Sequence, residues 1–232
     1  DVIAAINALS PVENLAYDLD DLELATSAVN NAEALYDELS DEEKAMVSNY
    51  VILLEAKDVI AARQFEKLVY DRLGELEEIT LSSIPIVEEV HDAYDLLSTR
   101  QRSYVREYYI TLFTDAINAI NHEWDEVHAV EALISALPQV IEATDAEIES
   151  AQAVILQARG AYEALDDVQK NEVRNYSFLV SAEAALENAS TILNVIDLIS
   201  QIPEVIIPAH QQIIEAAREA YDALSEENML LV

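Results

Sequence analysis

A tyrosine-centred pattern occurs four times along the chain, and it constrains the fold more than any other feature of the sequence. In each copy an alanine or valine lies four residues before the tyrosine and a leucine three residues after it. The four tyrosines are Tyr36, Tyr94, Tyr162 and Tyr221. In the first three copies a second tyrosine follows 14 residues later, at Tyr50, Tyr108 and Tyr176. Such self-similarity indicates an array built from one supersecondary unit.

A second element, of the form Val-x-x-x-Ile-x-x-Leu, gives the length of the unit. It starts at Val2, Val69, Val130 and Val195, so successive repeats are 67, 61 and 65 residues long. These starts predict four repeats along the chain: 1–68, 69–129, 130–194 and a truncated fourth repeat, 195–232. On this interpretation the sequence stops in the middle of a repeat.

The composition favours long helices. Only two glycines and five prolines occur in 232 residues, which leaves little material for turns or sheet edges. The formal net charge is −34, and a chain so charged would be disordered if it had few hydrophobic residues. Because 52% of the residues are hydrophobic, the chain can bury a core despite this repulsion.

The same composition argues against several classes of function. Nucleic acids and anionic membranes require clustered lysine and arginine, whereas acidic residues outnumber basic residues by 46 to 12. The absence of cysteine excludes disulfides, thiolate zinc sites and a cysteine nucleophile. No run of 18 apolar residues occurs, so membrane insertion is not expected.

Helix boundaries follow from capping signals after each tyrosine segment. Ser40 with Glu43, and Ser98 with Gln101, fit the capping box. Asp166-Asp167-Val168-Gln169 and Ser225-Glu226-Glu227-Asn228 are variants of the same signal. Each copy is therefore predicted to contain a helix, a tight turn and another helix.

The second helix of each pair is predicted to run without a break into the next repeat. No helix-breaking residue occurs in 42–73, 99–137 or 167–202. Helices of about 35 residues would span roughly 50 Å. The predicted fold class is all-α: tandem spectrin-like three-helix bundles that share long continuous helices and form an elongated rod.

Two polar segments resemble metal sites at first sight. The run Asp18–Glu23 has many carboxylates, but Glu23 and Val29 occupy the positions where a calcium loop has glycine and glutamate. The alternative, a cap for the helix that carries Tyr36, fits better. His122 and His128 are six residues apart, which places them on different helix faces. We therefore expect no metal site, no cofactor and no enzymatic activity.

The tyrosines have two possible roles. They can fill the core near a turn with their hydroxyls at the bundle edge, or they can form a stacking platform for a sugar or a protein partner. The second repeat has more aromatic residues than the others. The candidate partner-binding residues are Tyr104, Tyr108, Tyr109 and Phe113.

The third copy, from Ala158-Arg159 through Tyr162 and Gln169-Lys170 to Asn175-Tyr176, resembles a helical repeat of Gram-positive bacterial surface proteins. That repeat reads A-R-x-A-Y-D-A-L-T-x-x-Q-K-x-x-V-x-N and occurs in S-layer-type proteins, giant adhesins and modular extracellular glycosidases. The second copy departs from it, with His91, Arg102 and Glu107 where Arg, Lys and Asn are usual. Those departures put the polar contacts of the repeat in question there.

The resemblance implies extracellular display, at the cell surface or in the cell wall, and a structural role without catalytic residues. The first hypothesis is a spacer that holds functional domains away from the envelope, with other domains of the same polypeptide or surface-layer neighbours as partners. The alternative is a helical binding module that captures a host protein or glycan. A solvent-facing apolar patch found in only one repeat would favour the alternative.

Overall fold

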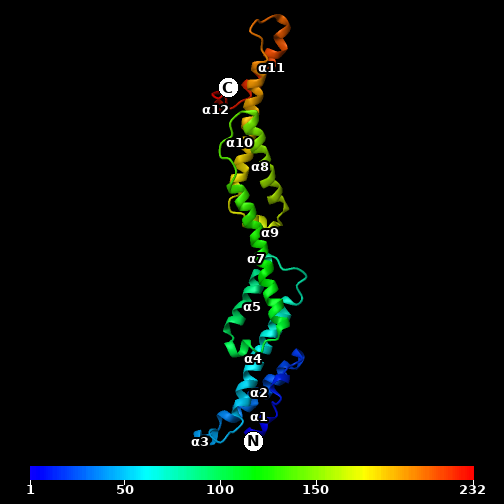
Figure 1. Ribbon diagram of the computed structural model, residues 1–232, viewed down its shortest axis with the longest axis vertical. Helices are drawn as coiled ribbons and strands as arrows, with labels where there is room; N and C mark the ends of the chain where they lie inside the picture. Colours follow the sequence, from blue (N-terminus) through cyan, green and yellow to red (C-terminus); the bar gives the residue numbers. More distant parts are fainter. The chain divides into compact units, whose positions relative to one another are not determined.

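The computed structural model describes residues 1–232, which form helices and turns and no strand. The prediction of an all-α fold is thereby confirmed. Two compact units make up the chain, Asp1–His122 and Glu123–Val232. The boundary between them falls within the helix α7, Glu107–Ser135 (Figure 1). None of the helices combines the length and the apolar composition that crossing a membrane requires.

Unit 1 alternates long helices with short helices and turns. Its α-helices, before α7, are α1 (Val2–Asn7), α2 (Leu22–Asp37), α3 (Asp41–Lys44), α4 (Tyr50–Leu73), α5 (Ile84–Leu96) and α6 (Thr99–Arg102). Its 3-10 turns are η1 (Val12–Asn14), η2 (Leu19–Asp21) and η3 (Leu81–Ser83).

The helix α4 contributes to two separate hydrophobic clusters in unit 1. Its first half, including Leu53 and Val59, packs with α1 and α2. Its second half, including Phe65 and Val69, packs with α5 and with residues of α7 such as Phe113. Figure 1 shows α2 beside the beginning of α4 and α5 beside its end. One continuous helix therefore stabilises two neighbouring cores.

Unit 2 repeats the alternation of long and short helices. After α7 come α8 (Asp145–Ala164), α9 (Asp167–Glu172), α10 (Tyr176–Ser200), η4 (Pro208–His210), α11 (Gln211–Asp222) and α12 (Glu226–Met229). The helix α10 packs against both α8 and α11. Trp124, in the part of α7 that belongs to unit 2, is half-buried and stacks on His128, with ring centroids 5.8 Å apart.

The predicted caps are present. The side chain of Ser40 accepts a hydrogen bond from the amide of Glu43, whose carboxylate accepts one from the Ser40 amide. This contact with Ser40 lowers the pKa of Glu43. Reciprocal capping boxes also form at Ser98 and Asp166. The side chains of Thr144 and Ser225 likewise cap α8 and α12.

The prediction of unbroken helices over 42–73, 99–137 and 167–202 was wrong. Each segment begins with a short helix (α3, α6 or α9), turns, and then continues as α4, α7 or α10, with 24, 29 and 25 residues. Each turn is joined to another helix by a hydrogen bond that involves a side chain. Asn49 donates to the carbonyl of Ile3 in α1, and Glu131 in α7 accepts from the amide of Arg174. Amides and side chains thus find partners at the turn that a straight helix would not provide.

The acidic run of residues 18–23 caps a turn and not the helix directly. The Asp18 side chain accepts from the amide of Asp20 and begins the turn η2. The helix α2 starts later, at Leu22, and its N-cap residue Asp21 makes no side-chain capping bond. The carboxylates still lie at the positive end of a helix, where they are favoured.

Candidate functional site

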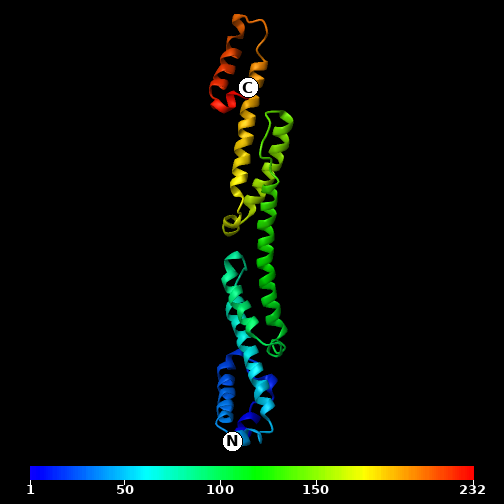
Figure 2. The same ribbon diagram turned by 90° about the vertical axis from the view of Figure 1, so that its left-hand side faces the viewer.

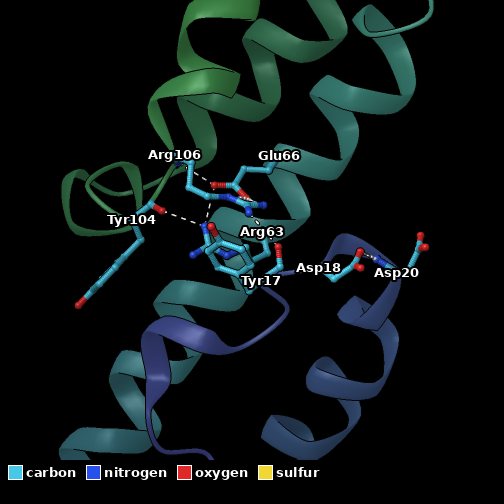
Figure 3. Close-up of polar contacts among 7 residues, drawn as sticks. All are labelled: Tyr17, Asp18, Asp20, Arg63, Glu66, Tyr104 and Arg106. Carbon is cyan, nitrogen blue, oxygen red and sulfur yellow. Dashed lines mark hydrogen bonds and ion pairs between the residues drawn. The ribbon is translucent and has the colours of Figure 1, made fainter.

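The most unusual side chain of unit 1 is Glu66 in α4, which is 0% exposed. Burying a carboxylate is costly unless the charge is paired and its lone pairs accept hydrogen bonds. Two guanidinium groups supply this compensation. Arg63 donates from Nη1 to Oε1 at 2.7 Å, and Arg106 donates from Nη2 and Nε to Oε2 at 2.6 and 2.9 Å (Figure 3). We refer to Arg63, Glu66 and Arg106 as the buried ion cluster.

The buried ion cluster connects α4 to two turns. The backbone amide of Arg106, just before α7, donates to Glu66 Oε1 at 2.7 Å. The Arg106 side chain also donates to the carbonyl of Tyr17 at 2.8 Å. Arg63 donates to the carbonyl of Tyr104 at 3.1 Å. Three chain segments far apart in sequence are therefore joined through Glu66 and its two arginines.

Two opposing effects act on the charge of Arg106. Burial disfavours the charged guanidinium, but the hydrogen bonds and the negative charge of Glu66 outweigh burial, and the pKa of Arg106 is raised. Both oxygens of Glu66 accept hydrogen bonds from arginines of the same cluster. This geometry is suited to holding chain segments together.

The candidate partner-binding residues separate into different environments. Phe113 is buried in the second core of unit 1 and packs edge-on against Phe65. Tyr104 is partly buried, and its hydroxyl donates to Glu55 at 2.9 Å. Figure 3 shows the Tyr104 ring pointing away from the buried ion cluster, while its carbonyl faces Arg63. Both side chains make contacts within unit 1, so they offer little surface to a partner.

Tyr108 and Tyr109 lie at the surface side of the same region. Tyr108 is 63% exposed and meets the edge of Tyr109, with centroids 5.0 Å apart. Arg106 lies over the rings of both Tyr109 and Tyr17, at 5.1 and 5.2 Å. Around Arg106, Tyr17 and Tyr108 are exposed and Tyr109 is half-buried between them and the core, and Tyr17 was not a sequence candidate.

A shallow pocket lies beside these aromatic residues, with a volume of about 390 Å³. Its lining residues are Tyr17, Asp18, Leu19, Asp20, Lys67, Tyr70 and Tyr109. The Lys67 ammonium donates a hydrogen bond to Asp71 Oδ1 at 2.8 Å, one helical turn further along α4. No group of three or more His, Asp or Glu side chains is arranged to hold a metal ion.

Tyrosine pairs distinguish the second copy from the other two complete copies. Tyr36 stacks on Tyr50 at 4.1 Å, and Tyr162 stacks on Tyr176 at 4.4 Å. In the second copy Tyr94 packs instead against the two phenylalanines of the core. This exchange leaves Tyr108, the equivalent of Tyr50 and Tyr176, without a stacking partner of that kind and exposed to solvent.

A basic residue eight positions after the first tyrosine holds the turn in all three complete copies. Lys44 and Lys170 donate to the carbonyls of Asp37 and Glu163, at 3.2 and 3.1 Å. In the second copy Arg102 donates to the carbonyls of Tyr94 and Leu97, both at 3.1 Å. The basic residue thus binds the end of the tyrosine-bearing helix in all three copies, although the arginine reaches different carbonyls from the lysines.

The buried ion cluster was missed in the sequence, although a signal exists. Glu66 lies three residues before Val69, and the residues at this position in the next copies are Val127 and Ile192. Both are buried. A charged residue where its equivalents are apolar and buried indicates a special contact, which comparing the copies position by position would have found.

Comparison with protein-family models, with curated proteins and with solved structures gives no match.

Proposed function

We propose that this chain is a non-catalytic spacer of a bacterial cell-surface or S-layer-like protein, built from tandem spectrin-like three-helix bundles. In this proposal the bundles share α4, α7 and α10 and form an elongated rod that holds functional domains away from the envelope. Its partners are other domains of the same polypeptide or neighbouring surface-layer subunits.

One observation carries the proposal: the two halves of α4 belong to two different cores. A helix shared in this way couples neighbouring bundles, because one bundle cannot rotate against the next without bending the helix. The buried ion cluster supports the same role. It ties α4 to the turn before α7 and to the loop at Tyr17.

Small-angle scattering of the purified chain tests the spacer. A compact domain of 232 residues would have a radius of gyration of about 17 Å. We expect a value at least about 1.5-fold larger, because α4, α7 and α10 are each about 36 to 44 Å long and would follow one another. A radius near the compact value would exclude the rod.

The surface location rests on the resemblance to the Gram-positive repeat, and the acidic composition supports it. A net charge of −34 keeps a protein soluble in crowded or salty surroundings. Antibodies against the chain should label intact cells of the source organism as strongly as permeabilised cells. Labelling that requires permeabilisation would contradict the proposal.

The second candidate function is a helical binding module for a host protein or glycan. It is favoured by the aromatic surface of Tyr17, Tyr108 and Tyr109, which is specific to one part of unit 1. Tyrosines with exposed ring faces are common anchors at interfaces.

A binding screen against glycans and host extracellular proteins separates the two functions. Changing Tyr108 to serine should abolish any specific capture, whereas the matched change of Phe178, 62% exposed on α10, should not. Equal loss in both variants, or no capture by the unchanged chain, would argue against the binding module.

A further inference from the structure

The helix α11 differs from the equivalent helices of the other copies in what covers it. In copies one to three the tyrosine-bearing helix is α2, α5 or α8, and it packs against residues of a third helix: α4, the start of α7, or α10. The helix α11, which carries Tyr221, has its main packing contact with a long helix on α10. Figure 2 shows α11 lying beside the last turns of α10.

Residues at equivalent positions are buried to different extents in α11 and in the other three helices. Seven positions before the tyrosine, Val29, Val87 and Ile155 are 1%, 7% and 3% exposed. Their equivalent on α11, Ile214, is only half-buried. The fourth copy thus leaves partly exposed an apolar position that the earlier copies cover.

Ile214 borders a groove within unit 2. One hollow of about 520 Å³ is lined by residues that include Ile206, Ile207 and Ile214, and a second of about 370 Å³ by residues that include Ile202 and Ile214. Arg218 also lines both hollows, so they adjoin along α11. We call them together the α10–α11 groove.

The polar contacts of the third copy indicate what fits this groove. Three positions before its tyrosine, Arg159 donates from Nε and Nη2 to both oxygens of Glu183 on the third helix, at 2.7 and 2.5 Å. These hydrogen bonds raise the pKa of Arg159. The stacking partner of Tyr162, Tyr176, lies seven residues before Glu183 on that helix.

The first copy has the same contact with the charges exchanged. Glu33, three positions before Tyr36, pairs with Lys57, seven positions after Tyr50. In the first and third copies, the residue three positions before the tyrosine therefore pairs with an opposite charge on the third helix.

In the fourth copy the equivalent arginine and tyrosine have no such partners. Arg218, three positions before Tyr221, is exposed and makes no ion pair, and Tyr221 has no aromatic partner. Because the residue is arginine, as in the third copy, an acidic residue would complement it and a lysine would not.

We propose that the α10–α11 groove binds an amphipathic helix from outside residues 1–232, with a tyrosine that stacks on Tyr221 and a carboxylate seven residues later that pairs with Arg218. The inference rests on the repeat architecture of the proposed function and not on its location at a cell surface. A second copy of the chain is a poor occupant. Its own α4, start of α7 and α10 already pack within their repeats.

The probe is a fluorescently labelled peptide of residues 167–193, which carries Tyr176 and Glu183. We expect saturable 1:1 binding to the whole chain in an anisotropy titration. Changing Arg218 to glutamate should weaken binding about tenfold, since two carboxylates would then face each other. A peptide with Glu183→Lys should bind this variant about tenfold better than the unchanged peptide does.

Three controls make the test decisive. Arg72→Glu, on the exposed surface of unit 1, should leave the affinity unchanged. An effect of Arg159→Glu equal to that of Arg218→Glu would show that the peptide displaces α10, which would overturn the proposal. Dimerisation of the chain alone through Arg218, seen by sedimentation, would make a second copy the occupant and would also overturn it.

Failure of this inference differs from failure of the spacer. If the peptide does not bind, or if Arg218→Glu has no effect, the helix-binding groove is wrong even when scattering reports an extended chain. A compact scattering profile with charge-dependent peptide binding would instead reject the rod and retain the groove.

Discussion

A single carboxylate balances two arginines inside unit 1, and this imbalance makes Glu66 the residue with most influence on local stability. Removing one member of a buried ion group leaves the others desolvated without compensation, which costs more than the net contribution of the pair. The remaining members here are Arg63, which is buried, and Arg106, which is partly exposed. The strongest effect is therefore expected at the carboxylate.

We predict that Glu66→Gln lowers the free energy of unfolding by about 3 kcal/mol. Glutamine keeps the shape and one acceptor oxygen but removes the charge that both guanidiniums face. Urea denaturation followed by circular dichroism measures the change. The matched control is Glu88→Gln on the exposed surface of α5, which should stay within about 0.5 kcal/mol of the unchanged chain. Equal midpoints for the two variants would show that the cluster contributes nothing.

The stacked tyrosines predict a loss of stability at alkaline pH. Desolvation by burial, together with the neighbouring ring of the pair, raises the pKa of Tyr36 and of Tyr162. The unfolded chain releases these protons near pH 10 while the folded chain retains them. The stabilisation is thus complete below about pH 10 and is lost as the pH rises through the folded pKa.

Absorbance at the tyrosinate band measures this effect. A fraction of the tyrosines should titrate later in the native protein than in urea, and Tyr162→Phe should reduce that fraction. Superimposable native and unfolded titration curves would contradict the prediction.

At the scale of elements, the ion pairs between helices have their charges arranged differently in different copies. Glu33 on α2 pairs with Lys57 on α4, whereas Arg159 on α8 pairs with Glu183 on α10. Helices of different copies therefore carry opposite charges at equivalent positions. A helix placed in the wrong repeat would bring like charges together, which disfavours misassembly of similar units.

Exchanging the two charges of the pair in the first copy tests whether this ion pair contributes to stability. Glu33→Lys alone should destabilise, and the double variant Glu33→Lys with Lys57→Glu should recover most of the loss. The pair is partly exposed, so a coupling of about 0.5 kcal/mol is expected from the double-mutant cycle. Additive effects would mean that the pair carries no orientation-dependent energy.

The sequence predicted the kind and the start of most helices because caps and apolar spacing are local signals. Ser40, Ser98 and Asp166 each begin a short helix, as their capping residues indicate. The turns between α3 and α4, and between their equivalents, were missed for a different reason. They depend on hydrogen bonds between the turn and another helix, from Asn49 to Ile3 in α1 and from the Arg174 amide to Glu131 in α7. These partners lie 46 and 43 residues away in the sequence, so the turn alone does not reveal them.

The candidate site could also be predicted only in part from the sequence. An excess of aromatic residues in the second repeat was visible, but which of them face solvent depends on tertiary packing. Phe113 and Tyr94 fill the core together, and this contact releases Tyr108 to the surface. Tyr17 joins the exposed group from another repeat, where only the fold brings it near Arg106.

At the scale of the whole molecule, charge repulsion opposes folding. The chain has 46 acidic and 12 basic residues, so at least 34 carboxylates have no basic partner even if every lysine and arginine pairs with one. Repulsion among exposed carboxylates acts over roughly 10 Å at 0.1 M salt and over roughly 3 Å at 1 M. Added salt weakens the ion pairs as well, but these are fewer than the unpaired charges.

We therefore predict that the urea midpoint rises from 0.01 to 0.5 M NaCl, with an unchanged slope of the unfolding free energy against urea. Urea is the suitable denaturant because guanidinium chloride would itself screen the charges. KCl at equal ionic strength should act equally, since screening depends on ionic strength and not on the identity of the cation. A midpoint that falls with salt would mean that ion pairs outweigh repulsion. A response to only one cation would indicate specific binding in place of screening.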